Sequence, residues 1–420
     1  MRPAHADAAL AARALLQDRG WIARHAEAFR HLPPPQARVW LGDEAEPAAA
    51  GCAAHALAAP GWTLHPLGNP APGRVDARWL DAADAGQGAE LFAGLPLPEA
   101  GDAAPFGWAH RALCRHGLRL RIGPAQAAAG GASAAVWLQL RHQPRATVEA
   151  PLLVIEVLAG VHCVLVERHE GEPLDGRTGI VQNLQAHIRL GAGATLQHLR
   201  IAAPGAGDRI AHHLHARLDR GARYDQALVA TGSRYHLQRS EIDLPAAQAT
   251  ARSAGVLFAA GTALEQQVQV SHGAPDTASA VEALVLASGT ARTVVNAHTR
   301  IAPGCDDAAV RQRLSGIPTG GQPRLVLRPH LEINHDQVQA THGATWGALP
   351  EEALFYARQR GLDDNAARGL IVTGMARAML ERGLGGPELM QTLAIDALLN
   401  GAVARHLGAG MATEPEAGHE

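Results

Sequence analysis

The chain has 420 residues, a formal net charge of −3, and arginine as its only strongly basic residue, because the sequence contains no lysine. Such a length can bury two or three hydrophobic cores, and so small a net charge excludes a general attraction to nucleic acid or to an anionic membrane. Without lysine there is no Walker A phosphate lysine and no Schiff base, so we expect no bound nucleotide and no ATP hydrolysis by this chain.

Residues 1–110 are predicted to form an N-terminal helical and irregular region. Helical spacing of apolar residues extends over 5–30, and the three prolines at 33–35 end that helix. The stretch 41–105 is rich in alanine, glycine and proline, which indicates short helices and loops. The predicted buried stripe of the first helix is Leu10, Leu15, Leu16, Trp21 and Ile22.

Residues 115–347 are predicted to form the core of the protein, with strand-like alternation of apolar and polar residues. The runs 184–190 and 210–218 both alternate in this way. An aliphatic residue followed by a small one recurs at spacings of 28, 26, 26 and 31 residues. A turn that recurs at this period is typical of a solenoid, and with strands the expected product is a right-handed parallel β-helix. The recurring pairs are Leu190/Gly193, Leu218/Gly221, Leu244/Ala247, Val270/Gly273 and Ile301/Gly304.

Residues 348–410 return to helical spacing and are predicted to form a C-terminal helical domain. Pro350 suits the first helical position, and Glu351 and Glu352 suit the first turn, where the helix dipole favours anions. Gly361 suits the end of that helix. Two further helices are expected, from about 363 to 382 and from about 389 to 408, followed by a disordered tail at 411–420. The fold class expected is therefore mainly β, with a parallel β-helix core flanked by α-helical regions.

The four cysteines are scattered and none belongs to a C-x-x-C pair, which argues against a self-contained zinc or four-cysteine cluster site. In a chain of this length they indicate reduced thiols of a cytosolic protein. The N-terminus does not look like a secretory signal, and no apolar run is long enough to span a bilayer. We therefore expect a soluble, cytoplasmic protein that contacts neither membrane nor nucleic acid. The cysteines are Cys52, Cys114, Cys163 and Cys305.

The densest cluster of chemically informative residues lies at 328–361. His342 stands beside Gly343 at the end of a predicted strand, where its imidazole can reach a metal such as iron. A predicted helix follows, with Phe355, Tyr356 and two nearby arginines. In order and spacing, LEI at 331–333, HGAT at 342–345, LFY at 354–356 and R-x-R-G at 358–361 resemble the SufD family of iron–sulfur cluster assembly proteins. Weaker similarity extends upstream to about residue 265.

The resemblance implies a non-enzymatic scaffold subunit of a SufB–SufC–SufD complex. It implies a SufB-like paralogue as partner and a SufC-like ABC ATPase that docks on the C-terminal helical domain. A transient iron–sulfur cluster or iron would form at the paralogue interface, with His342 as a ligand shared with the partner. Ala340 stands where some members have cysteine, so no thiolate is expected from that position. A sulfur-donating desulfurase system and a homodimer of the isolated chain are further expected partners.

The resemblance also suggests which residues contact the ATPase. Aromatic residues and arginines are enriched at interface hot spots. The alternative is that Leu354 and Phe355 belong to the core and that the arginines are a solvated face. The predicted ATPase interface consists of Phe355, Tyr356, Arg358 and Arg360.

Other interpretations of the sequence remain open at this point. A carbohydrate-active β-helix enzyme needs two carboxylates in a groove, and Glu332 and Asp336 are closely spaced acids near His342. Placed on one strand they would share a face about 13 Å apart, too far for glycosidase chemistry. SufB itself is disfavoured by the absence of clustered cysteines. The three histidines His212, His213 and His215 indicate an exposed strand more than a weak metal site.

Overall fold

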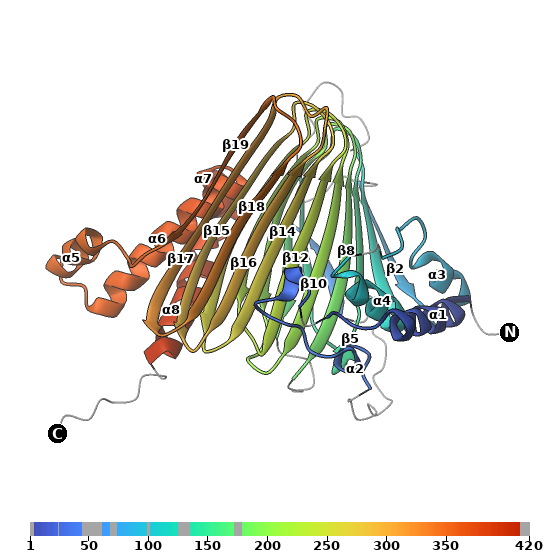
Figure 1. Cartoon of the computed structure of the whole chain (residues 1–420), viewed down its shortest axis with the longest axis horizontal. Helices are drawn as coiled ribbons and strands as arrows, with labels where there is room; N and C mark the ends of the chain where they lie inside the picture. The colour runs from blue at the N-terminus through green and yellow to red at the C-terminus, as the bar shows by residue number, and fades with distance from the viewer. Residues whose placement is uncertain are drawn as a thin grey trace.

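The computed structural model is a β-helix made of two facing sheets, with helices packed on the outside of each sheet (Figure 1). The structure describes residues 4–23, 25–43, 61–67, 74–98, 101–124, 135–171 and 179–411. Each coil contributes one strand to each sheet, and consecutive strands of a sheet are parallel except at the first coil. The mainly β fold class and the β-helix expected from the sequence are thus confirmed.

The nine-stranded sheet, called sheet A below, contains the odd-numbered strands from β7 onward. Its first pair, β1 and β4, is antiparallel. In order, sheet A is β1 (Trp62–Pro66), β4 (Val136–His142), β7 (His162–Glu170), β9 (Thr195–Ala203), β11 (Arg223–Thr231), β13 (Thr250–Ala260), β15 (Ala278–Gly289), β17 (Ala308–Gly321) and β19 (Val338–Trp346).

The ten-stranded sheet, called sheet B, faces sheet A across the interior of the coils. Its pair β2 and β3 is antiparallel, and the short β5 (Val148–Glu149) pairs with β8 off the main path. From the last coil to the first, sheet B is β18 (Arg324–Ile333), β16 (Arg292–Ile301), β14 (Ala263–His272), β12 (Tyr235–Leu244), β10 (Arg209–Leu218), β8 (Val181–Leu190), β6 (Leu152–Val157), β3 (His116–Ile122) and β2 (Val75–Asp81).

The turns that lead from sheet B to sheet A stack on one another. At each of these turns a residue with positive φ donates its backbone N–H to a carbonyl of the next coil, which fixes the coil spacing. The sequence repeat located these turns, but register shows that His272, and not Val270, is equivalent to Leu244 and Ile301. The stacked donors are Gly160, Gly193, Gly221, Gln248, Asp276 and Asp307.

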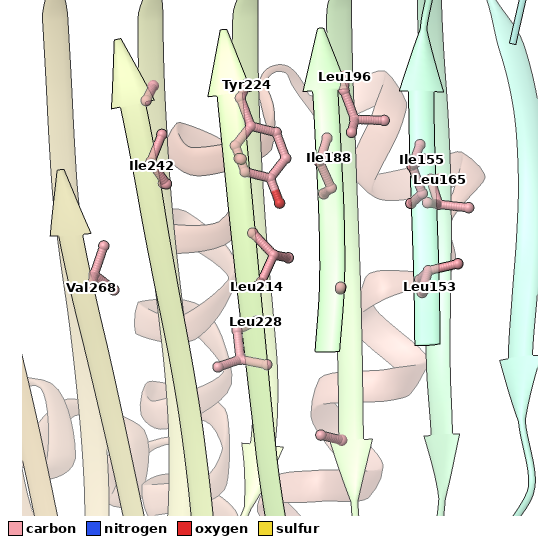
Figure 2. Close-up of a cluster of buried hydrophobic side chains, with 14 of the residues drawn as sticks. Leu153, Ile155, Leu165, Ile188, Leu196, Leu214, Tyr224, Leu228, Ile242 and Val268 are labelled. Carbon is pink, nitrogen blue, oxygen red and sulfur yellow. The ribbon is translucent and has the colours of Figure 1, made fainter. Parts of the chain in front are cut away.

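The interior of the coils, called the lumen below, holds the main hydrophobic core. Leu214, Tyr224 and Ile242 point into it from neighbouring strands (Figure 2). The alternating residues of the runs 184–190 and 210–218 that the sequence analysis grouped together are all buried. Burial of one leucine side chain stabilises the fold by about 2 kcal/mol, so this core accounts for much of the cohesion between coils.

N-terminal elements cover the outer face of sheet B. Trp40 and Phe106 pack against one another with ring centroids 5.0 Å apart, above Leu237 of β12. The elements are α1 (Ala4–Arg19), the short 3₁₀ helix η1 (Glu27–Phe29), α2 (Ala37–Trp40), α3 (Ala85–Glu90) and α4 (Ala104–Leu113).

The N-terminal region departs from the sequence expectation in three respects. Helix α1 ends at Arg19, because Gly20 adopts φ +81°. Leu10, expected in the buried stripe, is 50% exposed, whereas Leu16 is buried. Strands β1 and β2 lie within 41–105, where short helices and loops were expected; Trp62 and Leu80 bury their side chains there.

C-terminal helices cover the outer face of sheet A. The helices are α5 (Glu351–Gln359), α6 (Asp364–Leu384), α7 (Pro387–Thr392) and α8 (Ile395–Met411). Asp363 caps α6 through Ala366 N, and Gly383 lies so close to Ala254 of β13 that an added Cβ would meet that residue's Cβ at 2.4 Å. The expected third helix is split into α7 and α8, with Ala394 at φ +50° between them. Most of the predicted disordered tail lies outside the described residues.

No helix within the described ranges combines the length and the apolar character needed to cross a membrane.

Candidate functional site

His342 lies in β19, the last strand of sheet A, and its register defines which way it faces. Its partner in the parallel strand β17 is Gln312, and partners in parallel strands point to the same side of a sheet. The Gln312 side chain is buried and donates from Nε2 to Thr299 Oγ1 at 2.9 Å and to His330 O at 3.1 Å. His342 is therefore placed on the luminal side of the final coil.

His342 is nonetheless exposed, because the β-helix ends at this coil. Strands β18 and β19 are the last of their sheets, and no other described strand pairs with their outer edges. Trp346, two pleats further along β19 on the same side, is 67% exposed. Gly343, the next residue, faces the outer side of the sheet, and a Cβ added there would meet no atom within 4 Å, so that side of β19 is open as well.

The two carboxylates singled out near His342, Glu332 and Asp336, do not form an acid pair. The sequence analysis placed Glu332 and Asp336 on one strand, but Asp336 lies in the turn between β18 and β19. Glu332 is on the outer face of β18 and forms an ion pair with Arg300 at 3.3 Å. A carboxylate held by arginine on the outside of the coil is not arranged as a glycosidase acid or base.

Three of the four cysteines are buried, and Cys52 lies outside the described residues. Burial raises the pKa of Cys114 and of Cys163 to about 12. Burial also raises the pKa of Cys305, whose Sγ donates to His272 O at 3.3 Å. A thiol of this kind is neither a good nucleophile nor a ready metal ligand, since both roles need the thiolate.

The predicted ATPase interface lies on α5, which projects away from the sheets beside α6 (Figure 1). Phe355 is 62% and Tyr356 is 59% exposed. Arg360 donates to Tyr356 Oη at 2.6 Å and lies over its ring. Arg358 forms an ion pair with Asp364 at the start of α6. Phe355 is therefore not core, whereas the neighbouring Leu354 packs against the cluster beneath α6.

The three histidines of β10 do not lie on an exposed strand, and they do not share one site. His212 faces the lumen and is buried, with Nε2 2.5 Å from Gln182 Oε1. His213 is buried on the outer face, with its ring centroid 4.8 Å from that of Phe106. His215 pairs with Glu241 at 3.1 Å. The sequence expectation of an exposed strand is thus wrong for two of the three.

The lumen contains a buried polar cluster, called the luminal cluster below, centred on Glu167. Burial alone would raise the pKa of this carboxyl, but Arg200 and hydrogen bonds from His169 and His198 hold it well below its usual range. Arg200 also donates to Gln238 Oε1 at 3.1 Å, and Gln238 in turn donates to His212 Nδ1 at 3.1 Å. Every side chain of the luminal cluster is buried.

Within the described ranges, no group of three or more histidine, cysteine, aspartate or glutamate side chains is arranged to hold a metal ion. His342 therefore stands as a single imidazole donor on an exposed strand.

The family model described as "SUF system FeS cluster assembly, SufBD core domain" matches residues 140–375, more than half of the chain. The chain belongs to the SufBD family. The match begins in β4 and ends inside α6, so it includes the terminal coil, His342 and the whole of α5.

Individual relatives agree with this assignment over shorter segments. A SufBD family protein of Mycobacterium tuberculosis is 29% identical over 191 residues, 43% of this chain and 47% of the relative. The iron-sulfur cluster assembly protein SufD of Escherichia coli is 28% identical over 96 residues, 23% of each chain. A Synechocystis SufBD family protein is 39% identical over 59 residues, 14% of this chain and 13% of the relative. The aligned segments span less than half of each relative.

Two features of this SufBD chain were missed by the sequence analysis. Trp346 directly follows the HGAT motif, and its aromatic side chain on an exposed strand was a signal that could have been used. The luminal cluster gave a weaker signal, the polar pairs Glu167/His169 and His198/Arg200 at strand spacing. Only the stacking of coils brings these two pairs into contact.

Proposed function

We propose that this chain is a SufD-type, non-enzymatic scaffold subunit on which an iron–sulfur cluster is assembled together with a SufB-like paralogue. The observation that carries the proposal is the exposed imidazole of His342 on the luminal side of β19, whose outer edge pairs with no other described strand. Each described cysteine is buried at the same time. A single imidazole supplies one donor, whereas iron in a cluster needs several, so the remaining ligands come from sulfide and from the partner.

The unpaired edges of β18 and β19 are the proposed contact with the paralogue. An edge strand presents unsatisfied N–H and C=O groups that another strand can pair. Exposed Trp346 and Ile333, which is 43% exposed, add apolar area to this end of the molecule. The cluster is cargo at this interface, and the same surface supports a homodimer when the chain is isolated.

The proposed partner for α5 is a SufC-like ABC ATPase that hydrolyses the nucleotide for the complex. The aromatic pair Phe355 and Tyr356, with Leu370 of α6 61% exposed, forms an apolar surface rimmed by arginine. Such a composition is typical of an interface hot spot. A desulfurase system that supplies sulfur and a cytoplasmic location complete the proposal. A carbohydrate-active enzyme is not favoured, because the family match and the ion-paired Glu332 both speak against it.

The test is to co-express the chain with its SufB-like and SufC-like partners and to measure iron and sulfide per complex. We expect the His342→Ala complex to have normal size and composition but to contain at least about tenfold less iron than the wild-type complex. Loss of even a residue that only supports a metal ligand typically lowers metal affinity by about tenfold or more. His342→Cys should restore part of the iron. His330→Ala is the matched control, because His330 is also exposed but lies on β18 of the same coil.

Unchanged iron and sulfide in the His342→Ala complex would show that the site lies elsewhere. Loss of the complex itself in that variant would show that His342 is part of the paralogue interface and not a ligand.

A further inference from the structure

A groove of about 850 Å³ lies where the strands of sheet B begin. One wall is the proline segment at residues 33–35 with Leu32 and Val39, and the other wall is formed by the starts of β10, β12, β14 and β16. The proline segment is held down by Trp40, whose Nε1 donates to Pro35 O at 3.2 Å.

The groove is strongly cationic. Arg38, Arg209, Arg234 and Arg292 line it, and its described lining includes no aspartate or glutamate. Arg38 has contacts of its own, but no described residue forms an ion pair with any of the other three. The four guanidinium groups around the cavity repel one another, because their charges are unneutralised or only partly neutralised. An anion bound there would reduce this repulsion.

The register of sheet B explains why these arginines gather. Position by position along consecutive strands, Arg209 pairs with Tyr235, and Ala263 pairs with Arg292, which pairs with Arg324. Strands in a sheet lie about 4.8 Å apart, so Arg209 of β10 and Arg292 of β16, three strand spacings from one another, start about 14 Å apart on this edge of the coils. Arg234, directly before β12, lies between these two strands and is the third arginine that sheet B brings to the groove.

A histidine next to the groove wall lies near a second group of arginines, none of which lines the groove itself. The pKa of His31 is lowered first by burial and then by Arg328, Arg30 and Arg324. His31 directly precedes Leu32 of the groove wall.

Two hydroxyl groups of the lining residues lack hydrogen-bond partners among the described residues. Tyr235 is only 3% exposed, and its Oη is without a partner, as is Oγ1 of Thr262. Buried polar groups are almost always paired with protein, water or a ligand. Both oxygens are buried in the wall of the groove, so the groups that line the open cavity are chiefly the guanidinium groups.

We propose that this groove binds a small phosphate ester that carries a diphosphate group and an apolar or aromatic portion. Guanidinium groups bind phosphate oxygens in bidentate fashion, and Leu32, Val39 and the prolines offer a surface for the apolar portion. The volume is that of a site for a small molecule. Among the described lining residues there is no carboxylate to hold Mg²⁺ or to act as a base, so the proposal is one of binding and includes no hydrolysis. This revises the expectation that the chain binds no nucleotide, which rested on lysine-dependent motifs alone.

The test is isothermal titration of the full chain with ADP, inorganic pyrophosphate and inorganic phosphate. We expect ADP and pyrophosphate to bind at least about tenfold more tightly than phosphate, because two phosphate groups engage more guanidinium groups. The double variant Arg209→Gln/Arg292→Gln should weaken ADP binding by about tenfold or more. The control Arg217→Gln/Arg220→Gln removes the same charge at the other end of β10 and should leave ADP binding unchanged.

Three results would overturn the proposal. The first is the absence of ADP and pyrophosphate binding at millimolar concentration. The second is an equal loss of binding in both double variants, which would show a general charge effect. The third is binding of single-stranded RNA or of phosphatidylglycerol vesicles, lost in Arg209→Gln/Arg292→Gln, without binding of either diphosphate probe.

Discussion

The histidines of the lumen and the histidine of the terminal coil show how one residue type takes opposite roles in one β-helix. His198 and His212 lie on inward positions of β9 and β10, fully buried and held by Glu167, Tyr224, Gln182 and Gln238. His342 occupies an equally inward position on β19, but no coil follows to cover it. Position along the stack, and not the local strand, decides whether an inward imidazole is buried between coils or left exposed.

The largest expected effect that separates the two regions is the response of stability to acid. Burial lowers the pKa of His236 and His272 to about 4 and lowers those of His142 and His212 as well. Unfolded histidine binds its proton below about pH 6.5, so stability is lost as pH falls from there. His236 alone accounts for about 3 kcal/mol by pH 4.

Buried carboxyls act in the opposite sense and set the alkaline side. Burial raises the pKa of Glu149 to about 7 and that of Glu265 to about 8. Their contribution is complete below the unfolded pKa and is lost as pH rises through these values. Chemical denaturation from pH 4 to 9 should therefore show maximal stability near pH 6.5 with a steep acid side. A flat profile would show that the luminal histidines are not held neutral.

The next effect distinguishes a luminal carboxylate from one on the terminal coil. Glu167→Gln leaves the buried Arg200 without its counter-charge and should lower the free energy of unfolding by about 3–5 kcal/mol. Glu332→Gln removes an ion pair whose carboxylate side chain is 43% exposed and should cost about 1 kcal/mol or less. Urea denaturation of both variants tests this, and equal costs would mean that the luminal cluster contributes no more than a surface pair.

The smallest effect on stability belongs to the exposed helix α5. Phe355→Ala should change the free energy of unfolding by no more than about 0.5 kcal/mol, since the ring is 62% exposed. If it anchors the ATPase, association should weaken by about 2 kcal/mol, roughly 30-fold in Kd. Arg358→Glu is a less specific variant, because it also breaks the pair with Asp364.

Titration of the ATPase partner onto the purified chain measures this association. Leu10→Ala is the matched control, an exposed apolar residue on the N-terminal side of the molecule. A loss of folded structure in Phe355→Ala, with the Leu10 variant intact, would contradict the assignment of Phe355 to an interface.

The β-helix could be predicted from the sequence because apolar and polar residues alternate strictly along its strands. Such alternation is expected when one face of each strand is enclosed in a core. The runs 184–190 and 210–218 point inward as expected. The predicted repeat was two residues out of register at His272, because a histidine stands there in place of the usual aliphatic residue. Its ring nitrogens lie 2.8 Å from Thr277 Oγ1 and 2.8 Å from Ser279 Oγ. Nor does a local pattern reveal a contact such as that of Glu167 with Arg200, because the two residues lie on neighbouring coils.

The candidate site was located from its motif, but its environment was not. The residues around His342 in sequence indicated a strand and a glycine, and the structure adds the luminal direction and the exposure that come from being last in the stack. The arginine-lined groove left no trace in the sequence, because Arg209, Arg234 and Arg292 are far apart in the chain and meet only through strand register.

The reversed strands at the first coil give the molecule a polarity in how it can be extended. At one end, β18 and β19 continue the parallel direction of their sheets. At the other end, β1 and β2 run antiparallel to their neighbours, and β1 ends in Pro66. Only the end formed by β18 and β19 can be extended by a further coil with the same strand direction, so the molecule is directional along its stack.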